Sequence, residues 1–311
     1  MIGPTWLLED MLRVEQLLLD TAGSSDTPLV GEASTHLLKA GGKRLRPALV
    51  MISSRAGECG KPDSDLAAAA IELVHLATLY HDDVIDETDT RRGAPTVHSK
   101  WGLEVAILSG DYLFAKGCVL AATAGGAVTS ILSQAIAEVC EGQIIETTTV
   151  GEPTRSPDDY LRTIELKTAA LFGAAGELGA ATSGAEQLRE PLRTYGRNLG
   201  LAFQIVDDLL DLVGDPDVTG KTLGTDLREG VFTLPVLIAG GREPLLKERL
   251  ASGERDLAEL LPLIRSGHGI EGAQAEARTH AETALEAISD LPDTEWTQAL
   301  RDIPQGVLAQ I

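Results

Sequence analysis

The sequence predicts an all-α protein, and two observations carry that prediction. Almost every segment places its apolar residues at helical spacing, as residues 7–20 do with Leu8, Met11 and Leu12 among acidic residues. No segment shows the strict apolar–polar alternation that is typical of a half-buried strand. We therefore expect a single domain over residues 1–311, a bundle of helices around a central apolar cavity.

The helices follow from the periodicity and from their end signals. Gly41 and Gly42 would end one helix, Pro47 lies in the first turn of the next, and Pro157 would begin another. The predicted helices are, in chain order, residues 7–20, 31–40, 63–86, 101–124, 126–149, 157–181 and 185–213, followed by shorter amphipathic helices over roughly 243–311.

Composition narrows the class of protein. The chain has 311 residues, of which 43% are hydrophobic and 23% charged, so it is globular rather than disordered. Its formal charge of −21 argues against nucleic acid as the main partner and against a basic patch that adsorbs to anionic membrane. Local clusters of lysine and arginine become more informative in such a chain, because they oppose the overall charge.

The cysteines and the N-terminal residues indicate in which cellular compartment the protein is expected. The three cysteines, Cys59, Cys118 and Cys140, have no CxxC spacing and fit buried thiols in a reducing cytoplasm. The first residues carry acids at Glu9 and Asp10 and do not resemble a signal peptide. No run of about 18 apolar residues predicts a transmembrane helix.

Two acidic clusters close apolar helices. The first is Asp82, Asp83 and Asp86. Residues four apart on a helix share a face, so Asp82 and Asp86 project together and repel each other. A hard divalent cation would offset that repulsion, and magnesium is usually held by one or two carboxylates together with substrate phosphates.

The second cluster repeats the spacing far downstream, with Asp207, Asp208 and Asp211. One such cluster alone could equally be a solvated helix end. Two matched clusters, each on an apolar helix, favour a pair of metal-binding sites.

Cationic residues stand at several of the segment boundaries. Lys43 and Arg46 lie in the segment GGKRLRP, and Arg91 and Arg92 follow the first acidic cluster. Glycines before a helix can let a phosphate approach backbone N–H groups, although a loop with solvated cations is the common alternative. Lys167 is a lone lysine in an apolar helix, either snorkelling to solvent or facing a phosphate.

These segments, in this order, closely resemble the trans-isoprenyl diphosphate synthases, or polyprenyl synthetases. The resemblance covers nearly the whole chain and includes GGKRLRP at 41–47, HDDVIDETDTRRGAPT at 81–96, GDYLFAKG at 110–117, KTAALF at 167–172, FQIVDDLLD at 203–211 and GKTLGTDLREG at 220–230. It implies the isoprenoid synthase fold, a homodimer, and a Mg²⁺-dependent prenyltransferase. Such an enzyme condenses isopentenyl diphosphate with an allylic diphosphate.

The resemblance also implies roles for individual residues. It assigns the magnesium site to both clusters, with Asp82, Asp86 and Asp207 as direct ligands and with Asp83 and Asp211 in support. Asp211 counts among the metal-binding residues, and Asp83 and Asp208 count among the catalytic residues. It assigns the allylic diphosphate to Arg91, Lys167 and Lys221, with Thr168 and Gln204 near the ionising carbon. It assigns isopentenyl diphosphate to a separate pocket made by Lys43, Arg46, His75 and Arg92, although a histidine such as His75 is more often a core residue.

One position departs from the family. Many relatives carry a lysine after the segment DLREG, and this chain has Val231 there. The resemblance still implies activity, with a weaker contact to the allylic diphosphate.

Product length depends on the helix before the first acidic cluster. In the family, bulky residues there block the growing chain, whereas this chain has Ala77, Thr78 and Val74. We therefore expect a product longer than farnesyl diphosphate. The alternatives are a farnesyl or geranylgeranyl diphosphate synthase, or one subunit of a heteromeric synthase. A class I terpene cyclase is disfavoured, because it usually carries a different second metal motif and needs no GGKRLRP segment.

Overall fold

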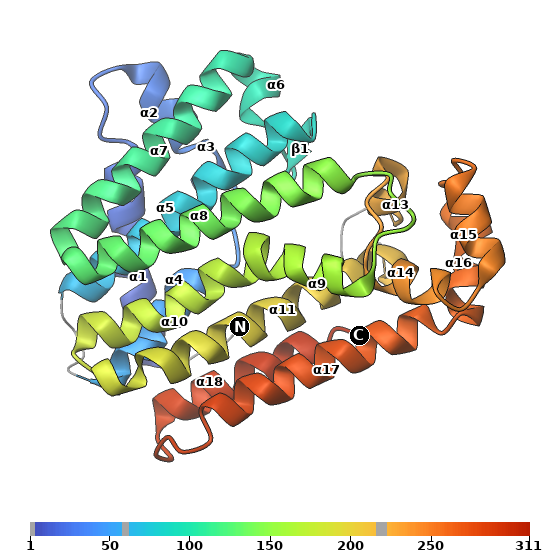
Figure 1. Cartoon of the computed structure of the whole chain (residues 1–311). Coiled ribbons are helices and arrows are strands. Elements are labelled where there is room, and N and C mark those ends of the chain that lie inside the picture. Colours follow the sequence, from blue (N-terminus) through green and yellow to red (C-terminus); the bar gives the residue numbers. More distant parts are fainter. Residues whose placement is uncertain (1–3, 58–61, 216–222) are drawn as a thin grey trace. The chain divides into compact units, whose positions relative to one another are not determined.

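The computed structural model describes residues 4–57, 62–215 and 223–311, and these are helical almost throughout (Figure 1). The elements are α1 (Thr5–Ala22), α2 (Pro28–Ser34), α3 (His36–Lys39), α4 (Leu45–Ser53), η1 (Ser54–Ala56), α5 (Pro62–Ile85), β1 (Thr90–Arg91), β2 (Ala94–Pro95), α6 (Val97–Trp101), α7 (Leu103–Ala124), α8 (Gly126–Thr149), α9 (Pro157–Ile164), η2 (Glu165–Ala169), α10 (Ala170–Ser183), η3 (Glu186–Leu188), α11 (Arg189–Val213), α13 (Thr225–Glu229), α14 (Leu234–Gly240), α15 (Pro244–Ala251), α16 (Leu257–Ser266), α17 (Gly269–Ala287) and α18 (Glu295–Leu308).

The predicted helices are confirmed in position, with several differences. The helix expected over 31–40 is divided at Thr35 into α2 and α3, and the helix expected over 185–213 begins with the 3₁₀ turn η3 before α11. The helix expected over 157–181 contains a π-helical turn, η2, between α9 and α10. The helix expected over 101–124 begins at Leu103, because Gly102, with a φ of 95°, separates α7 from the short helix α6, which ends at Trp101. The two short strands β1 and β2 form a hairpin where no strand was expected.

The chain divides into two compact units. The first comprises Met1–Ile136, Ala174–Arg193 and Asp293–Ala299, and the second comprises the remaining segments, Ala137–Gly173, Thr194–Pro292 and Leu300–Ile311. The single domain expected over 1–311 stays a prediction.

In the first unit, α5 is the central helix and α7 lies alongside it (Figure 1). The alanine run of α5, Ala67–Ala70, is fully buried. Gly117 of α7 permits the close approach, because a Cβ there would lie 3.0 Å from the carbonyl oxygen of Ala70. Tyr80, on another face of α5, donates a hydrogen bond to the carbonyl oxygen of Ala33 at 2.6 Å.

In the second unit, glycines likewise set the helix spacing. A Cβ at Gly200 of α11 would lie 2.7 Å from the Cα of Ala169, so α11 passes directly against the π-helical turn. A Cβ at Gly269 would overlap the carbonyl oxygen of Pro235, which brings α17 against α14. The start of α9 is fixed by a capping box in which Ser156 and Asp159 bond each other's backbone N–H groups.

The structure bears on two expectations from the sequence, the burial of the cysteines and the absence of a membrane-spanning helix. Cys118 is half-buried and Cys140 is exposed, and both are free thiols, so the prediction of buried thiols is wrong for Cys140. Cys59 lies outside the described residues. Within the described part of the chain, α7 is the one helix long and apolar enough to cross a membrane, which is weak evidence because core helices pass the same test.

We predict that Gly176→Ala destabilises the protein and that Gly306→Ala does not. A Cβ at Gly176 would overlap the carbonyl oxygen of Leu192, so backbone must move, at a cost of roughly 2–4 kcal/mol. Gly306 lies in the exposed interior of α18 with no atom near such a Cβ, and alanine there should add about 0.5–1 kcal/mol. Chemical denaturation of both variants checks this, and equal stabilities would contradict it.

Candidate active site

The first acidic cluster lies at the C-terminal end of α5. Asp82 is half-buried and Asp86 is exposed, and the N–H of Asp86 donates to the carbonyl oxygen of Asp82 at 2.8 Å. This bond continues the helical turn, so Asp82 and Asp86 share a face as the spacing predicts. Asp83 is 1% exposed, and its carboxylate accepts a hydrogen bond from the guanidinium of Arg91. Burial raises the pKa of Asp83, and Arg91 opposes that shift.

The hairpin after this cluster carries the two adjacent arginines. Its turn has Arg92 and Gly93 at φ values of 54° and 74°, which is the left-handed geometry of a tight two-residue hairpin. The turn directs Arg92 to the backbone carbonyls of Leu37, at 3.3 Å, and of Gly41. The hairpin therefore separates Arg91, which holds Asp83, from Arg92, which lies against the segment before α4.

That segment builds a cationic cluster with α5. Burial lowers the pKa of Arg46 to about 10, with Glu72 opposing the shift and Arg92 adding to it. Burial also lowers the pKa of His75 well below its usual value, and the guanidiniums of Arg46 and Arg92 lower it further. The structure thus brings Arg46, His75 and Arg92 together, whereas Lys43 is exposed in the adjoining loop.

A buried carboxylate underlies this cluster. Glu72 is 2% exposed, and burial raises its pKa. Arg44, in the left-handed conformation at a φ of 49°, donates to Glu72 at 3.2 Å and to Glu15 at 2.9 Å. With Glu72 already shared between several guanidiniums, the cluster retains an excess of positive charge and suits a multiply charged anion.

The second acidic cluster lies near the end of α11. Asp207 and Asp211 are half-buried, and the two carboxylate oxygens of Asp211 accept hydrogen bonds from the N–H groups of Thr225 and Asp226 at 3.1 and 3.2 Å. The start of α13 is therefore tied to Asp211.

The middle carboxylate of the second cluster points into the unit. Asp208 is 5% exposed and accepts hydrogen bonds from the hydroxyl of Tyr160 and from Gln204 at 2.7 Å. Burial raises its pKa to about 7, against the opposing effect of both hydrogen bonds.

Asp226 adds a further carboxylate to this cluster. Burial raises its pKa to about 9, and the negative charges of Asp208, Asp211 and Asp207 raise it further. A group of carboxylates that repel one another suits a hard divalent cation, because all of its donors are oxygens.

The described carboxylates do not form a complete metal site by themselves. Among the described residues, no three histidine, cysteine or acidic side chains converge closely enough to hold a metal ion. This arrangement fits magnesium, which is typically bound by one or two carboxylates and completed by water and substrate phosphates.

The π-helical turn η2 presents the next set of predicted residues. Lys167 forms an ion pair with Glu146 of α8, and Thr168 donates to the amide oxygen of Gln204 at 3.0 Å. Gly142 makes room for this turn, because a Cβ there would overlap the backbone nitrogen of Lys167. Such single π-helical turns occur frequently at functional sites.

The remaining predicted residues are those assigned to product length, together with Val231 and Lys221. Val74 and Ala77 are 1% exposed, and Val74 packs against α7 at Gly117. The hydroxyl of Thr78 donates to the carbonyl oxygen of His75 at 2.7 Å. Val231 is half-buried, and its backbone N–H donates to the carbonyl oxygen of Asp226. Lys221 lies outside the described residues.

The family model for polyprenyl synthetase matches residues 27–260, well over half of the chain. The chain belongs to the polyprenyl synthetase family. Members of this family are prenyltransferases, so the protein is a transferase of that class, with the isoprenoid synthase fold of its structural neighbours.

Three similar proteins span almost the whole of this polyprenyl synthetase. The nonaprenyl diphosphate synthase of Mycobacterium tuberculosis is 40% identical over 299 residues, covering 93% of this chain and 88% of the relative. Heptaprenyl diphosphate synthase component 2 of Geobacillus stearothermophilus is 39% identical over 308 residues, covering 96% and 95%. The polyprenyl synthase of Caulobacter crescentus, solved with calcium and isoprenyl diphosphate, has a TM-score of 0.90 and 35% identity, covering 97% and 95%.

Several residues of the site were not found in the sequence. Glu72 could have been found, because it is a lone carboxylate in the apolar run AAAAIELVHLA. Tyr160, Glu146 and Asp226 carry no comparable signal, because none of them is a lone polar residue within a long apolar run and their contacts depend on the packing of their elements.

We predict that the stability of the metal-free protein falls as pH rises from about 4 to about 9. The carboxyl of Asp226 has an ordinary pKa near 3.9 when unfolded and about 9 when folded. The folded state therefore binds more protons across this window, and stability is lost as pH rises through it.

In Asp226→Asn, the free energy of unfolding should fall less steeply with pH, because the amide mimics the neutral carboxylic acid. The gain at pH 8 should be at least about 1.4 kcal/mol, the equivalent of one pKa unit. Thermal unfolding with EDTA at several pH values measures it, and Asp290→Asn is the matched control at an exposed aspartate. Parallel pH profiles for wild type and Asp226→Asn would contradict the interpretation.

Proposed function

We propose that this polyprenyl synthetase condenses isopentenyl diphosphate with an allylic diphosphate to give an all-trans polyprenyl diphosphate longer than farnesyl. The observation that carries the proposal is that the described residues include two kinds of charged cluster. Two carboxylate clusters suited to Mg²⁺ occur together with a separate cationic cluster suited to a second anion.

The allylic substrate is assigned to the carboxylate side. On the resemblance to the family, Asp82, Asp86, Asp207 and Asp211 would hold Mg²⁺, which neutralises charge on the departing diphosphate when it is bound. Asp83 and Asp208 support these pairs from the protein interior. We assign Lys167, which forms an ion pair with Glu146, to the allylic diphosphate together with Arg91 and Lys221, on the resemblance to the family.

Isopentenyl diphosphate is assigned to the cationic cluster. Arg46 and Arg92 supply two guanidiniums for the diphosphate, and Lys43 adds charge from the loop. The lowered pKa of His75 keeps its imidazole neutral near pH 7, so it contributes as a hydrogen-bonding group rather than as a charge.

The reaction then needs little covalent chemistry from the protein. The allylic C–O bond breaks, the double bond of isopentenyl diphosphate attacks the allylic cation, and the proton that is lost passes to the departing diphosphate. We assign the stabilisation of the cation's charge to the oxygens of Thr168 and Gln204, which are joined by a hydrogen bond. An apolar cavity along the alanine-rich part of α5 would keep the cation from water.

Product length is assigned to α5. The side chains of Ala77, Thr78 and Val74 are all small, and the names of both curated relatives above specify seven or nine prenyl units. Tyr80 lies between Ala77 and the acidic cluster and donates its hydroxyl to the carbonyl oxygen of Ala33, so a growing chain that passes Ala77 meets no further phenylalanine, tyrosine or tryptophan on this helix.

We also propose that the protein is a cytoplasmic homodimer. The exposed face of α7 carries Leu103, Ile107, Leu108 and Val119, which are 39–65% exposed. An apolar row of this kind is typical of a covered interface. A heteromer is the second candidate, because one similar protein is named as component 2 of a synthase.

Product analysis tests the function. Purified protein is incubated with Mg²⁺, isopentenyl diphosphate and geranyl, farnesyl or geranylgeranyl diphosphate, and product mass is determined. We expect polyprenyl diphosphates longer than farnesyl with Mg²⁺ and none with EDTA. No elongation from any primer would favour the heteromer, and Val231→Lys is the first variant to assay in that case.

The same assay on Ala77→Phe tests the chain-length assignment. The added ring should shorten the product while elongation continues, whereas the small control Ala77→Ser should keep the wild-type length. An unchanged product in Ala77→Phe would refute the assignment to α5.

A further inference from the structure

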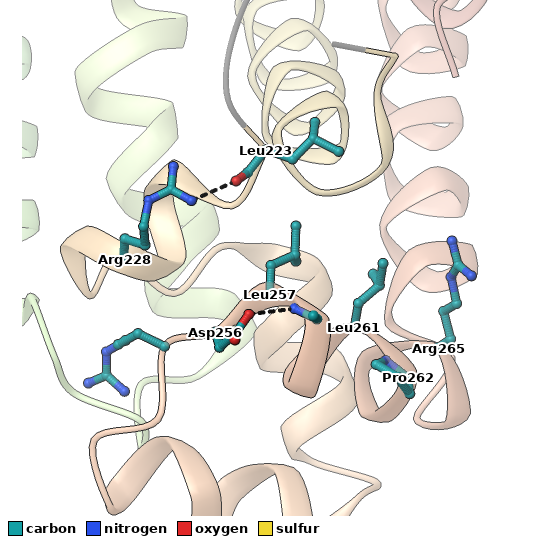
Figure 2. Close-up of a pocket in the computed structure, with 9 residues that line it drawn as sticks. Leu223, Arg228, Asp256, Leu257, Leu261, Pro262 and Arg265 are labelled. Atoms are coloured by element: carbon teal, nitrogen blue, oxygen red, sulfur yellow. Dashed lines mark hydrogen bonds between the residues drawn. The ribbon is translucent and has the colours of Figure 1, made fainter.

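A pocket of about 930 Å³ opens in the second unit, between the start of α13 and α16 (Figure 2). It is lined by three leucines, three arginines and one aspartate, together with Ala258 and Pro262: Leu223, Leu257, Leu261, Arg228, Arg255, Arg265 and Asp256. None of the residues assigned to either substrate lines it. The pocket is therefore distinct from the site described above, and an inference from it goes beyond the proposed function.

The apolar wall comes from one face of α16. Leu257 and Leu261 are four residues apart, so they lie on the same side of the helix. Figure 2 shows both side chains projecting from α16 toward the side on which Leu223 lies. Gly224 permits this packing, because a Cβ there would lie 2.9 Å from the Cβ of Leu257.

Two of the pocket arginines, Arg228 and Arg255, are held by neutral groups. Arg228 donates to the carbonyl oxygen of Leu223 and to the hydroxyl of Thr225, both at 2.8 Å. Arg255 donates to the carbonyl oxygen of Leu250 at 3.0 Å. Across residues 4–57, 62–215 and 223–311, no ion pair is formed by Arg228, Arg255 or Arg265.

The nearby carboxylates are engaged elsewhere. Asp256 accepts from the N–H of Ala258 at 2.9 Å as the cap of α16. Glu254 accepts from the N–H groups of Arg255 and Asp256, each at 2.8 Å. The chain has a net charge of −21, yet three arginines line this pocket. Because Asp256 and Glu254, both among the described residues, form no ion pair with them, the arginines give the pocket a locally positive potential.

We propose that this pocket binds an anionic amphiphile, with a phosphate-type head among the arginines and a single apolar chain over the leucines. Arginine is suited to the head because its fork of N–H donors matches phosphate oxygens. The volume lies in the range of sites that enclose ligands of drug-like size. The ligand could be a free alkyl or prenyl phosphate or a membrane phospholipid, which share this chemistry.

Titration calorimetry with dodecyl phosphate, below its micelle concentration and with EDTA present, tests the proposal. Wild type should bind dodecyl phosphate at least tenfold more tightly than inorganic phosphate. Arg265→Ala and Leu261→Asp should each weaken binding at least tenfold, and Arg278→Ala, at an exposed arginine of α17, should not. Arg265 is exposed, so its removal should leave the melting temperature unchanged.

Sedimentation with phosphatidylglycerol vesicles distinguishes the two sources. Binding to vesicles that Arg265→Ala abolishes supports a membrane phospholipid, and binding to dissolved dodecyl phosphate alone supports a free amphiphile. The proposal is overturned if wild type binds neither probe. It is equally overturned if Arg265→Ala and Leu261→Asp bind as wild type does.

Discussion

The middle carboxylate of each acidic cluster is turned into the protein and hydrogen-bonded there, and the direction of the other two depends on it. Asp83 accepts from Arg91, and Asp208 accepts from Tyr160 and Gln204. Because an α-helix advances 3.6 residues per turn, fixing one residue of a DDxxD segment sets the rotation of its neighbours. The buried carboxylate therefore sets the direction of the other two carboxylates, which are four residues apart. Burial is unfavourable for its charged form, which is why the pKa values of Asp83 and Asp208 are raised.

The arginine cluster is likewise built on buried charge, but here the charge is positive. Burial lowers the pKa of both Arg46 and Arg92, and the charge of Arg92 lowers the pKa of Arg46 further, which is costly for the folded protein. Glu72, buried beneath them, offsets part of that repulsion without neutralising it. Each of these clusters is thus held in a state of unbalanced charge, which binding of a diphosphate or a divalent cation would relieve.

Local signals were sufficient for the helices and for the acidic clusters. Helix α8 runs over the predicted residues because glycines mark its start, and Asp82 and Asp86 share a face because helical spacing requires it. The π-helical turn at Lys167 could not be predicted, because one inserted residue barely disturbs an apolar pattern. Asp226 and Tyr160 could not be predicted either, because their roles depend on packing between segments distant in sequence.

The central claim is that two diphosphates bind through different chemistry, one through carboxylates and Mg²⁺ and the other through arginines. Equilibrium binding tests it most directly, with isopentenyl diphosphate and an unreactive thio analogue of the allylic diphosphate, each with Mg²⁺ and with EDTA. The account predicts that the allylic analogue needs Mg²⁺ and loses binding in Asp82→Asn but not in Arg46→Ala. Isopentenyl diphosphate should bind with EDTA and lose binding only in Arg46→Ala. Loss of both ligands in either variant, or a need for Mg²⁺ by isopentenyl diphosphate, would contradict the division.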